Sequence, residues 1–160
     1  MSISTAKTAL RVVADTASQS KPDFVNTPET IDTIVSGWTT AKVMSDPRTS
    51  GVLGMSAVSL FFAAGQGHER HNHPESEQFI FVVSGHGEMM IEDTDGTPVT
   101  SPIKAGDLVS IPKGAYHSTF NTGWEPIRIL AVYCPPGPEA AMREGADFKV
   151  FKPGEIAKLG

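Results

Sequence analysis

The segment from residue 51 to 136 alternates between short apolar runs and short breaks that contain Gly, Pro or Asp. Each run has five to eight residues and holds β-branched, aromatic or long apolar side chains. Runs of this length at short, regular spacing, each closed by a turn signal, are typical of all-β barrels and sandwiches. The chain is therefore predicted to be an all-β protein. The predicted strands cover residues 55–62, 79–83, 88–92, 107–112, 117–121 and 127–133.

The two ends of the chain lack this strand pattern. Residues 1 to about 26 are rich in Ser, Thr and Ala, and we expect them to form an arm. A short helix is predicted to follow, with Thr27 as its N-cap, Pro28 at its first position and Gly37 just past its end. Residues 137–148 are predicted to hold a last short helix.

The chain has 160 residues, which is long enough to bury one hydrophobic core. Its hydrophobic content of 39% and charged content of 19% are typical of a folded globular protein. We expect a β-barrel domain over residues 37–160, with its core at 51–135 and a C-terminal tail. Residues 1–36 would precede it as the arm and short helix.

Charge and cysteine content limit the partners and the compartment. The net charge of −5 and the absence of a Lys/Arg cluster argue against nucleic-acid and anionic-membrane partners. The single Cys134 excludes an intramolecular disulfide and fits a reducing compartment. The longest apolar run, residues 60–64, falls far short of the roughly 20 residues that span a bilayer. With no signal-peptide pattern at the N-terminus, a cytoplasmic protein with a small-molecule partner is predicted.

All five histidines lie between residues 68 and 117. His71 and His73 are two residues apart, so in a strand their side chains would point to the same face. Two imidazoles at that spacing can share one divalent ion. A third nitrogen ligand would have to come from another strand, and His117 is the best candidate.

The glycines, proline and polar residues around these histidines form two strings with defined spacing. The first string reads Gly65, five residues, His71-x-His73, four residues, Gln78, six residues, Gly85. The second reads Gly106, five residues, Pro112-x-Gly114, two residues, His117, three residues, Asn121. Twenty residues separate Gly85 from Gly106. Both strings resemble the signature motifs of the cupin superfamily, and the only departure is Gln78, where the family usually has glutamate.

The resemblance implies a small double-stranded β-helix, or jelly-roll barrel, with a metal ion inside it. His71, His73 and His117 would be ligands, together with Gln78 at the position of the family's glutamate. The expected cofactor is a divalent transition metal. Imidazole accepts iron, manganese, nickel, zinc and copper, so the spacing does not choose among them.

Glu77 and Gln78 compete for the fourth ligand position. The carboxylate of Glu77 would be the better ligand for a hard cation, whereas Gln78 binds only through its amide oxygen. The spacing to Gly85 favours Gln78, because a shift of one residue turns a strand side chain to the opposite face. On the same argument Ile80 and Val82 share the face of Gln78 and line an apolar pocket. Phe79 and Phe81 are expected to pack between the sheets.

His68, Glu69 and Glu77 are the candidates for a general acid or base near the metal. Each has an alternative role. His68 fits a solvated loop residue, and the two carboxylates could instead orient the imidazoles of the metal ligands.

Three functions follow from the resemblance. The first is a dioxygenase-type oxidoreductase, because cupins with three metal-bound histidines are often dioxygenases. The second is a non-oxidative lyase, isomerase or cyclase, which the neutral Gln78 favours because several cupins with glutamine at this position have such activities. The third is a binding protein for a small sugar or carboxylate without turnover. The substrate is expected to be small, rich in oxygen and anionic, because neutral ligands leave the charge of the ion uncompensated.

A homodimer is also expected. The N-terminal arm could add a strand to an exposed sheet edge of a second copy. The cupin resemblance likewise implies a dimer.

Overall fold

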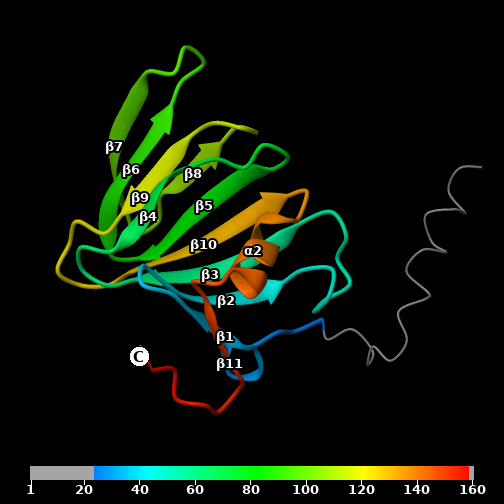
Figure 1. Cartoon of the computed structure of the whole chain (residues 1–160). Coiled ribbons are helices and arrows are strands. Elements are labelled where there is room, and N and C mark those ends of the chain that lie inside the picture. The colour runs from blue at the N-terminus through cyan, green and yellow to red at the C-terminus, as the bar shows by residue number, and fades with distance from the viewer. Residues whose placement is uncertain (1–23, 159–160) are drawn as a thin grey trace, which may run out of the picture.

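Two antiparallel β-sheets face one another and form the body of the molecule (Figure 1). The computed structural model describes residues 24–158. Buried apolar side chains from both sheets, such as Ile129 of the larger sheet and Met89 of the smaller, belong to one core cluster. The all-β fold predicted from the strand pattern, and the jelly roll implied by the cupin resemblance, are therefore confirmed.

The larger sheet has seven strands in the order β11-β1-β2-β3-β10-β5-β8. The strands, in chain order, are β1 (Thr33–Val35), β2 (Thr40–Ser45), β3 (Ser56–Phe62), β5 (Glu77–Ser84), β8 (Leu108–Ile111), β10 (Ile127–Cys134) and β11 (Lys149–Phe151).

The smaller sheet has four strands in the order β4-β9-β6-β7. The strands, in chain order, are β4 (Gly67–His71), β6 (His86–Glu92), β7 (Pro98–Lys104) and β9 (His117–Phe120). Consecutive strands such as β4 and β5 therefore lie in different sheets, as in a jelly roll.

The central strands alternate between buried and exposed residues, as a sheet with one covered face requires. On β5, Gln78, Ile80 and Val82 are buried, which agrees with the predicted apolar face. The prediction for Phe79 and Phe81 is wrong, because their side chains are 51% and 41% exposed on the outer face of the larger sheet. A strand places alternate residues on opposite faces, and within residues 24–158 no second layer covers this outer face.

The predicted helix between Thr27 and Gly37 is wrong for most of its length. Only Pro28–Thr30 form a helical turn, a short 3-10 helix that we label η2. The β-branched residues Thr33–Val35 form β1, which pairs with β2 on one side and β11 on the other. Two neighbouring strands satisfy the backbone of this segment, and these tertiary contacts override the local cap signal. β1 belongs to the larger sheet. The predicted division of the chain after residue 36 stays a prediction.

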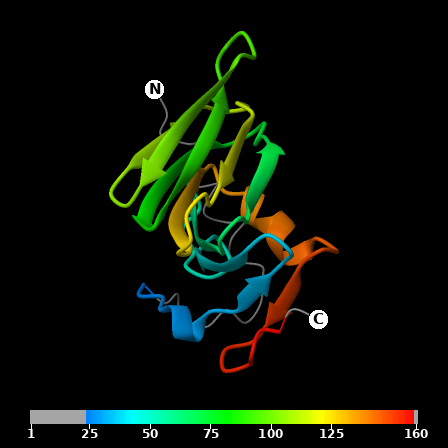
Figure 2. The same ribbon diagram turned by 90° about the vertical axis from the view of Figure 1, so that its left-hand side faces the viewer.

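The C-terminal segment returns to the barrel and packs beside its opening. The helix predicted within residues 137–148 is present as α2 (Pro138–Glu144), and β11 follows it and lies beside β1 (Figures 1 and 2). Among residues 24–158, no helix is long and apolar enough to cross a membrane. Most of the predicted N-terminal arm lies outside the described residues.

The backbones of β4 and β9 approach one another closely at Gly67. This residue is opposite Phe120, and His71 is opposite His117 further along the same pair of strands, after a bulge. A Cβ atom added at Gly67 would overlap the carbonyl oxygen of Thr119 and lie 2.7 Å from the Cα of Phe120. Glycine is therefore required where the two histidine-bearing strands meet.

We predict that Gly67→Ala lowers the free energy of unfolding by about 1–3 kcal/mol, the usual cost of forcing extra atoms into a packed region. Gly54→Ala is the matched control, because nothing lies within 4 Å of a Cβ atom added there. Urea unfolding of both variants measures the difference. Equal stability of the two variants would contradict the close approach of β4 and β9.

Candidate metal centre

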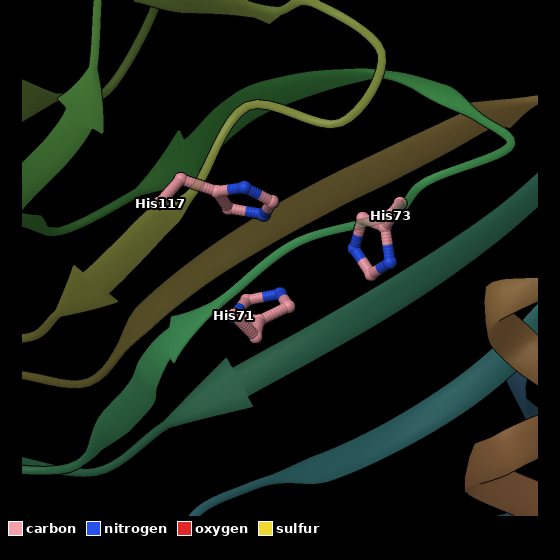
Figure 3. Close-up of side chains that lie close together, drawn as sticks. All are labelled: His71, His73 and His117. Carbon is pink, nitrogen blue, oxygen red and sulfur yellow. The ribbon is translucent and has the colours of Figure 1, made fainter. Parts of the chain in front are cut away.

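Three histidine side chains from different parts of the chain converge inside the barrel. His71 is the last residue of β4, His73 lies two residues beyond it, and His117 is the first residue of β9. One ring nitrogen from each lies within 4.8 Å of those of the other two. Figure 3 shows the three rings pointing toward a common space. This separation suits three nitrogen ligands on one transition-metal ion.

His73 reaches this space from a turn and not from a strand. Strand alternation, which predicted that His71 and His73 share a face, therefore does not place its ring. The backbone amide of Gly114 donates a hydrogen bond of 3.0 Å to the carbonyl oxygen of His73. The side-chain amide of Asn72 donates to the carbonyl oxygen of Gly114 at 3.2 Å. These two bonds hold the turn against the loop that leads into β9 and thereby position His73 near His117.

Backbone carbonyl groups fix the orientation of two of the three rings. The Nδ1 atom of His71 lies 2.7 Å from the carbonyl oxygen of Glu69, and Nδ1 of His117 lies 2.9 Å from that of Ala115. A carbonyl oxygen can only accept, so in each ring Nδ1 carries the hydrogen. The lone pair is then on Nε2, which is the atom left to bind a metal.

Three buried polar atoms of the site have no hydrogen-bond partner among the described residues. They are Nε2 of His73, Nε2 of His117 and Oε1 of Gln78. A buried acceptor without a partner costs about 1–3 kcal/mol, so such atoms are rare in folded proteins. All three side chains line the same cavity. A cation bound by these lone pairs would remove the cost, so the residues present fit a metal ion.

The structure places Gln78 and Glu77 on opposite faces of β5. Gln78 is only 4% exposed and faces the cavity, whereas Glu77 is exposed on the outer face. Gln78 lies between Tyr133 on β10 and Ile111 on β8, its partners in the sheet. Of the two candidates, only Gln78 is therefore within the site.

Burial keeps the three histidines neutral. It lowers the pKa of His73 and of His117 to about 4, and it also lowers the pKa of His71. Repulsion from the neighbouring imidazoles lowers the pKa of His73 further. Neutral imidazole is the form that binds a metal, so the free site is ready for an ion at pH 7.

The histidines line a cavity of about 280 Å³. Most of its wall is apolar, which is usual for a small-molecule site. The residues that line it are Trp38, Leu60, Phe62, His68, His71, Asn72, His73, Gln78, Ile80, His117, Thr119, Ile129, Tyr133, Pro138, Ala141, Met142 and Phe148.

Of the three acid–base candidates, only His68 lines the cavity. Its ring stacks on Trp38, with centroids 3.9 Å apart and planes 6° apart, and its centroid lies 3.6 Å from that of His71. Burial, followed by repulsion from the other histidines, lowers its pKa to about 3. Glu69 and Glu77 are exposed and do not line the cavity, so neither carboxylate faces the metal ligands.

The sequence patterns missed Trp38 and Tyr133. Trp38 lies between β1 and β2, in a segment where a helix end was expected, and only the fold brings it to His68. Tyr133 lies opposite Gln78 on β10, and its ring centroid is 5.1 Å from that of His73. The register of β10 with β5 is what places Tyr133 next to the site. The spacing of residues along one strand does not reveal that register.

Comparison with known proteins places these features in a family. Residues 59–133 match the family described as "Cupin domain". Germin-like protein subfamily 2 member 1 of Arabidopsis thaliana is 30% identical over 122 residues, which are 75% of this chain and 53% of the relative. Germin-like protein 8-14 of Oryza sativa subsp. japonica is 30% identical over 121 residues, which are 75% of this chain and 56% of the relative. The chain thus spans about half the length of these relatives.

Solved structures of oxalate decarboxylases share the fold. The enzyme of Lactobacillus farciminis, in a formate complex, superposes with a TM-score of 0.62 at 25% identity, over 67% of this chain and 32% of that one. A structure of the Bacillus subtilis enzyme, described as having Mn(II) centres, gives a TM-score of 0.60 at 21% identity, over 64% of this chain and 27% of that one.

The matched range, residues 59–133, contains both histidine strings in full, and the relatives and the jelly-roll structure agree with it. The chain belongs to the cupin superfamily.

Proposed function

We propose that this cupin is a divalent-metal-dependent enzyme of the dioxygenase type, acting on a small substrate that binds through oxygen atoms. The observation that carries the proposal is a group of partnerless buried atoms on side chains that line one cavity, namely Nε2 of His73, Nε2 of His117 and Oε1 of Gln78. With His71 they form a set of three nitrogen donors and one oxygen donor. Such a set holds one ion and leaves positions open for a substrate.

A divalent transition metal in this site would supply Lewis-acid and redox chemistry next to the cavity. The four proposed ligands are neutral, so the protein offers no negative charge of its own to the ion. An anionic oxygen of the substrate would be attracted to it for that reason. Iron, manganese, nickel, zinc and copper all suit imidazole ligands, and the Mn(II) centres of the B. subtilis structure add support for manganese.

The scarcity of acid–base groups in the cavity supports an oxygen-dependent reaction over a proton-transfer reaction, because His68 is the only one of the three predicted candidates that lines it. Among residues 24–158, no aspartate or glutamate lines the cavity. A lyase or isomerase needs a group that removes a proton within about 3 Å of the substrate. A dioxygenase can instead rely on the metal and O₂, with the side chains acting mainly to position the substrate.

A non-oxidative lyase, isomerase or cyclase is the second candidate. His68 lines the cavity and is the remaining acid–base group of the three predicted from the sequence. The likeness to oxalate decarboxylase structures also favours this alternative.

The cytoplasmic location expected from the sequence stays a prediction.

Turnover with and without oxygen separates these two functions. We expect protein loaded with Fe(II) or Mn(II) to convert a member of a panel of small carboxylates in air, with incorporation of ¹⁸O from ¹⁸O₂. His117→Ala should abolish this conversion, whereas His86→Ala, on the exposed start of β6, should not. Equal turnover under strict anaerobiosis would contradict the dioxygenase and favour the lyase.

We also propose that the chain forms a homodimer through the outer face of the larger sheet. Phe79, Phe81 and Leu108 are each at least 41% exposed there, and the register places Phe81 between Leu108 on β8 and Leu130 on β10. A contiguous apolar face of this kind is typical of an interaction surface. A second copy is the proposed occupant, because a flat sheet face can pack against itself across a two-fold axis.

Light scattering at micromolar concentration is expected to give the mass of a dimer. Phe81→Glu should shift the protein to monomer, because a charge in the centre of the face would be buried without a partner. Val99→Glu, at a 52% exposed position on β7 of the smaller sheet, is the matched control and should remain dimeric. A monomeric wild-type protein would contradict the proposal.

A further inference from the structure

We propose that the cavity binds a monocarboxylate with an apolar body, whose carboxylate faces the histidines and whose hydrocarbon part lies against α2. This inference names the substrate class of the metal centre proposed above, and it rests on that centre.

One face of α2 forms part of the cavity wall. Pro138, Ala141 and Met142 line the cavity. They are spaced three and four residues apart, so they lie on the same face of the helix. Met142 is buried, and Phe148, beyond the end of α2, continues the wall. The helix therefore presents hydrocarbon and a thioether to the ligand, and no charge.

Much of the remaining wall of the cavity is also apolar. The Trp38 ring lies 5.8 Å from that of Phe62 and 6.1 Å from that of Phe148, measured between centroids. Leu60 and Ile129, from adjacent strands of the larger sheet, line the cavity beside them. Apolar surface that faces a cavity gains free energy only when a ligand with apolar atoms covers it.

Buried polar contacts fix α2 in place. The carboxylate of Glu139, itself buried, accepts hydrogen bonds from the Ser56 hydroxyl at 2.7 Å and from the backbone amide of Gly137 at 2.8 Å. Arg143 forms an ion pair of 3.0 Å with the buried Asp46. Because these contacts tie the helix to β3 and to the turn after β2, the apolar wall is pre-formed and is available to select a ligand.

The charges of the cavity fit one carboxylate. Among the described residues, no lysine or arginine lines it, so the metal ion would be the only cation facing the ligand. One carboxylate can bind at the histidines. A second carboxylate placed away from the ion would have no cationic side chain in the cavity wall to pair with, which is unfavourable for a charge that is largely removed from water. Oxalate, named in the related structures, has no hydrocarbon part with which to cover the wall.

The volume of the cavity guides the choice of a test ligand. A volume of about 280 Å³ corresponds to about ten water-sized groups at about 30 Å³ each. Phenylacetate, with about ten non-hydrogen atoms, therefore suits the cavity as a test ligand. Acetate has the same carboxylate without the ring, and succinate replaces the ring by a methylene group that carries a second carboxylate.

The experiment is calorimetric titration of zinc-loaded protein with phenylacetate, acetate and succinate, with the zinc content measured before and after each titration. Zinc is chosen because it is not redox-active, so binding is measured without turnover. We expect phenylacetate to bind at least about tenfold more tightly than acetate or succinate, since even one extra buried methylene is worth about tenfold or more.

Met142→Gln tests the wall of α2 directly. It keeps the length of the side chain but adds a polar amide, and it should reduce the preference for phenylacetate over acetate to below about threefold. Glu144→Gln, at an exposed position on the same helix, is the control and should keep the full preference. If Met142→Gln does not fold, the ranking of the three ligands on the wild-type protein decides.

The outcomes separate the two proposals. Zinc retained at one ion per chain, with acetate or succinate as tight as phenylacetate, would overturn the apolar substrate class and leave the metal centre in place. A preference for phenylacetate that Met142→Gln does not reduce would overturn the role of α2 in it. Failure to retain zinc would overturn the metal centre and the inference that rests on it.

Discussion

The pairing of β4 with β9 is the contact on which the rest of the site depends. Its register places His71 opposite His117, and its close approach at Gly67 leaves no room for a side chain between the strands. His73 is then added by a turn that is hydrogen-bonded to the loop before β9. These backbone contacts bring together side chains that are far apart in the sequence.

The chemistry of the site follows from ligand side chains that are buried and uncharged. The histidines are kept neutral, and Gln78 takes the position where other cupins usually have a carboxylate. The cavity is lined mostly by apolar side chains, and the polar residues that hold α2 do not line it. A metal ion in this setting would face the ligand as a single concentrated charge. The apolar wall would then contribute specificity for the remainder of the ligand.

The sequence predicts the all-β fold, because strand alternation and turn signals are short-range patterns. The four ligands that the cupin resemblance implies line one cavity, and their binding of a metal stays a prediction. Strand alternation and the spacing to Gly85 predict that Gln78, and not Glu77, faces inward. Features that depend on distant pairing were not predictable. The segment after Thr30 becomes a strand only because β2 and β11 lie beside it, and Tyr133 reaches His73 only through the register of β10 with β5. The exposure of Phe79 and Phe81 depends on what covers the outer face, which alternation alone does not determine.

The most direct test of the account is the metal content of the protein purified without a tag or added metal. We predict close to one transition-metal ion per chain in the wild type. The ion should be lost in His73→Ala and retained in the control His86→Ala, since His86 lies outside the cavity. Equal trace amounts of metal in all three proteins, even after reconstitution, would contradict the metal centre.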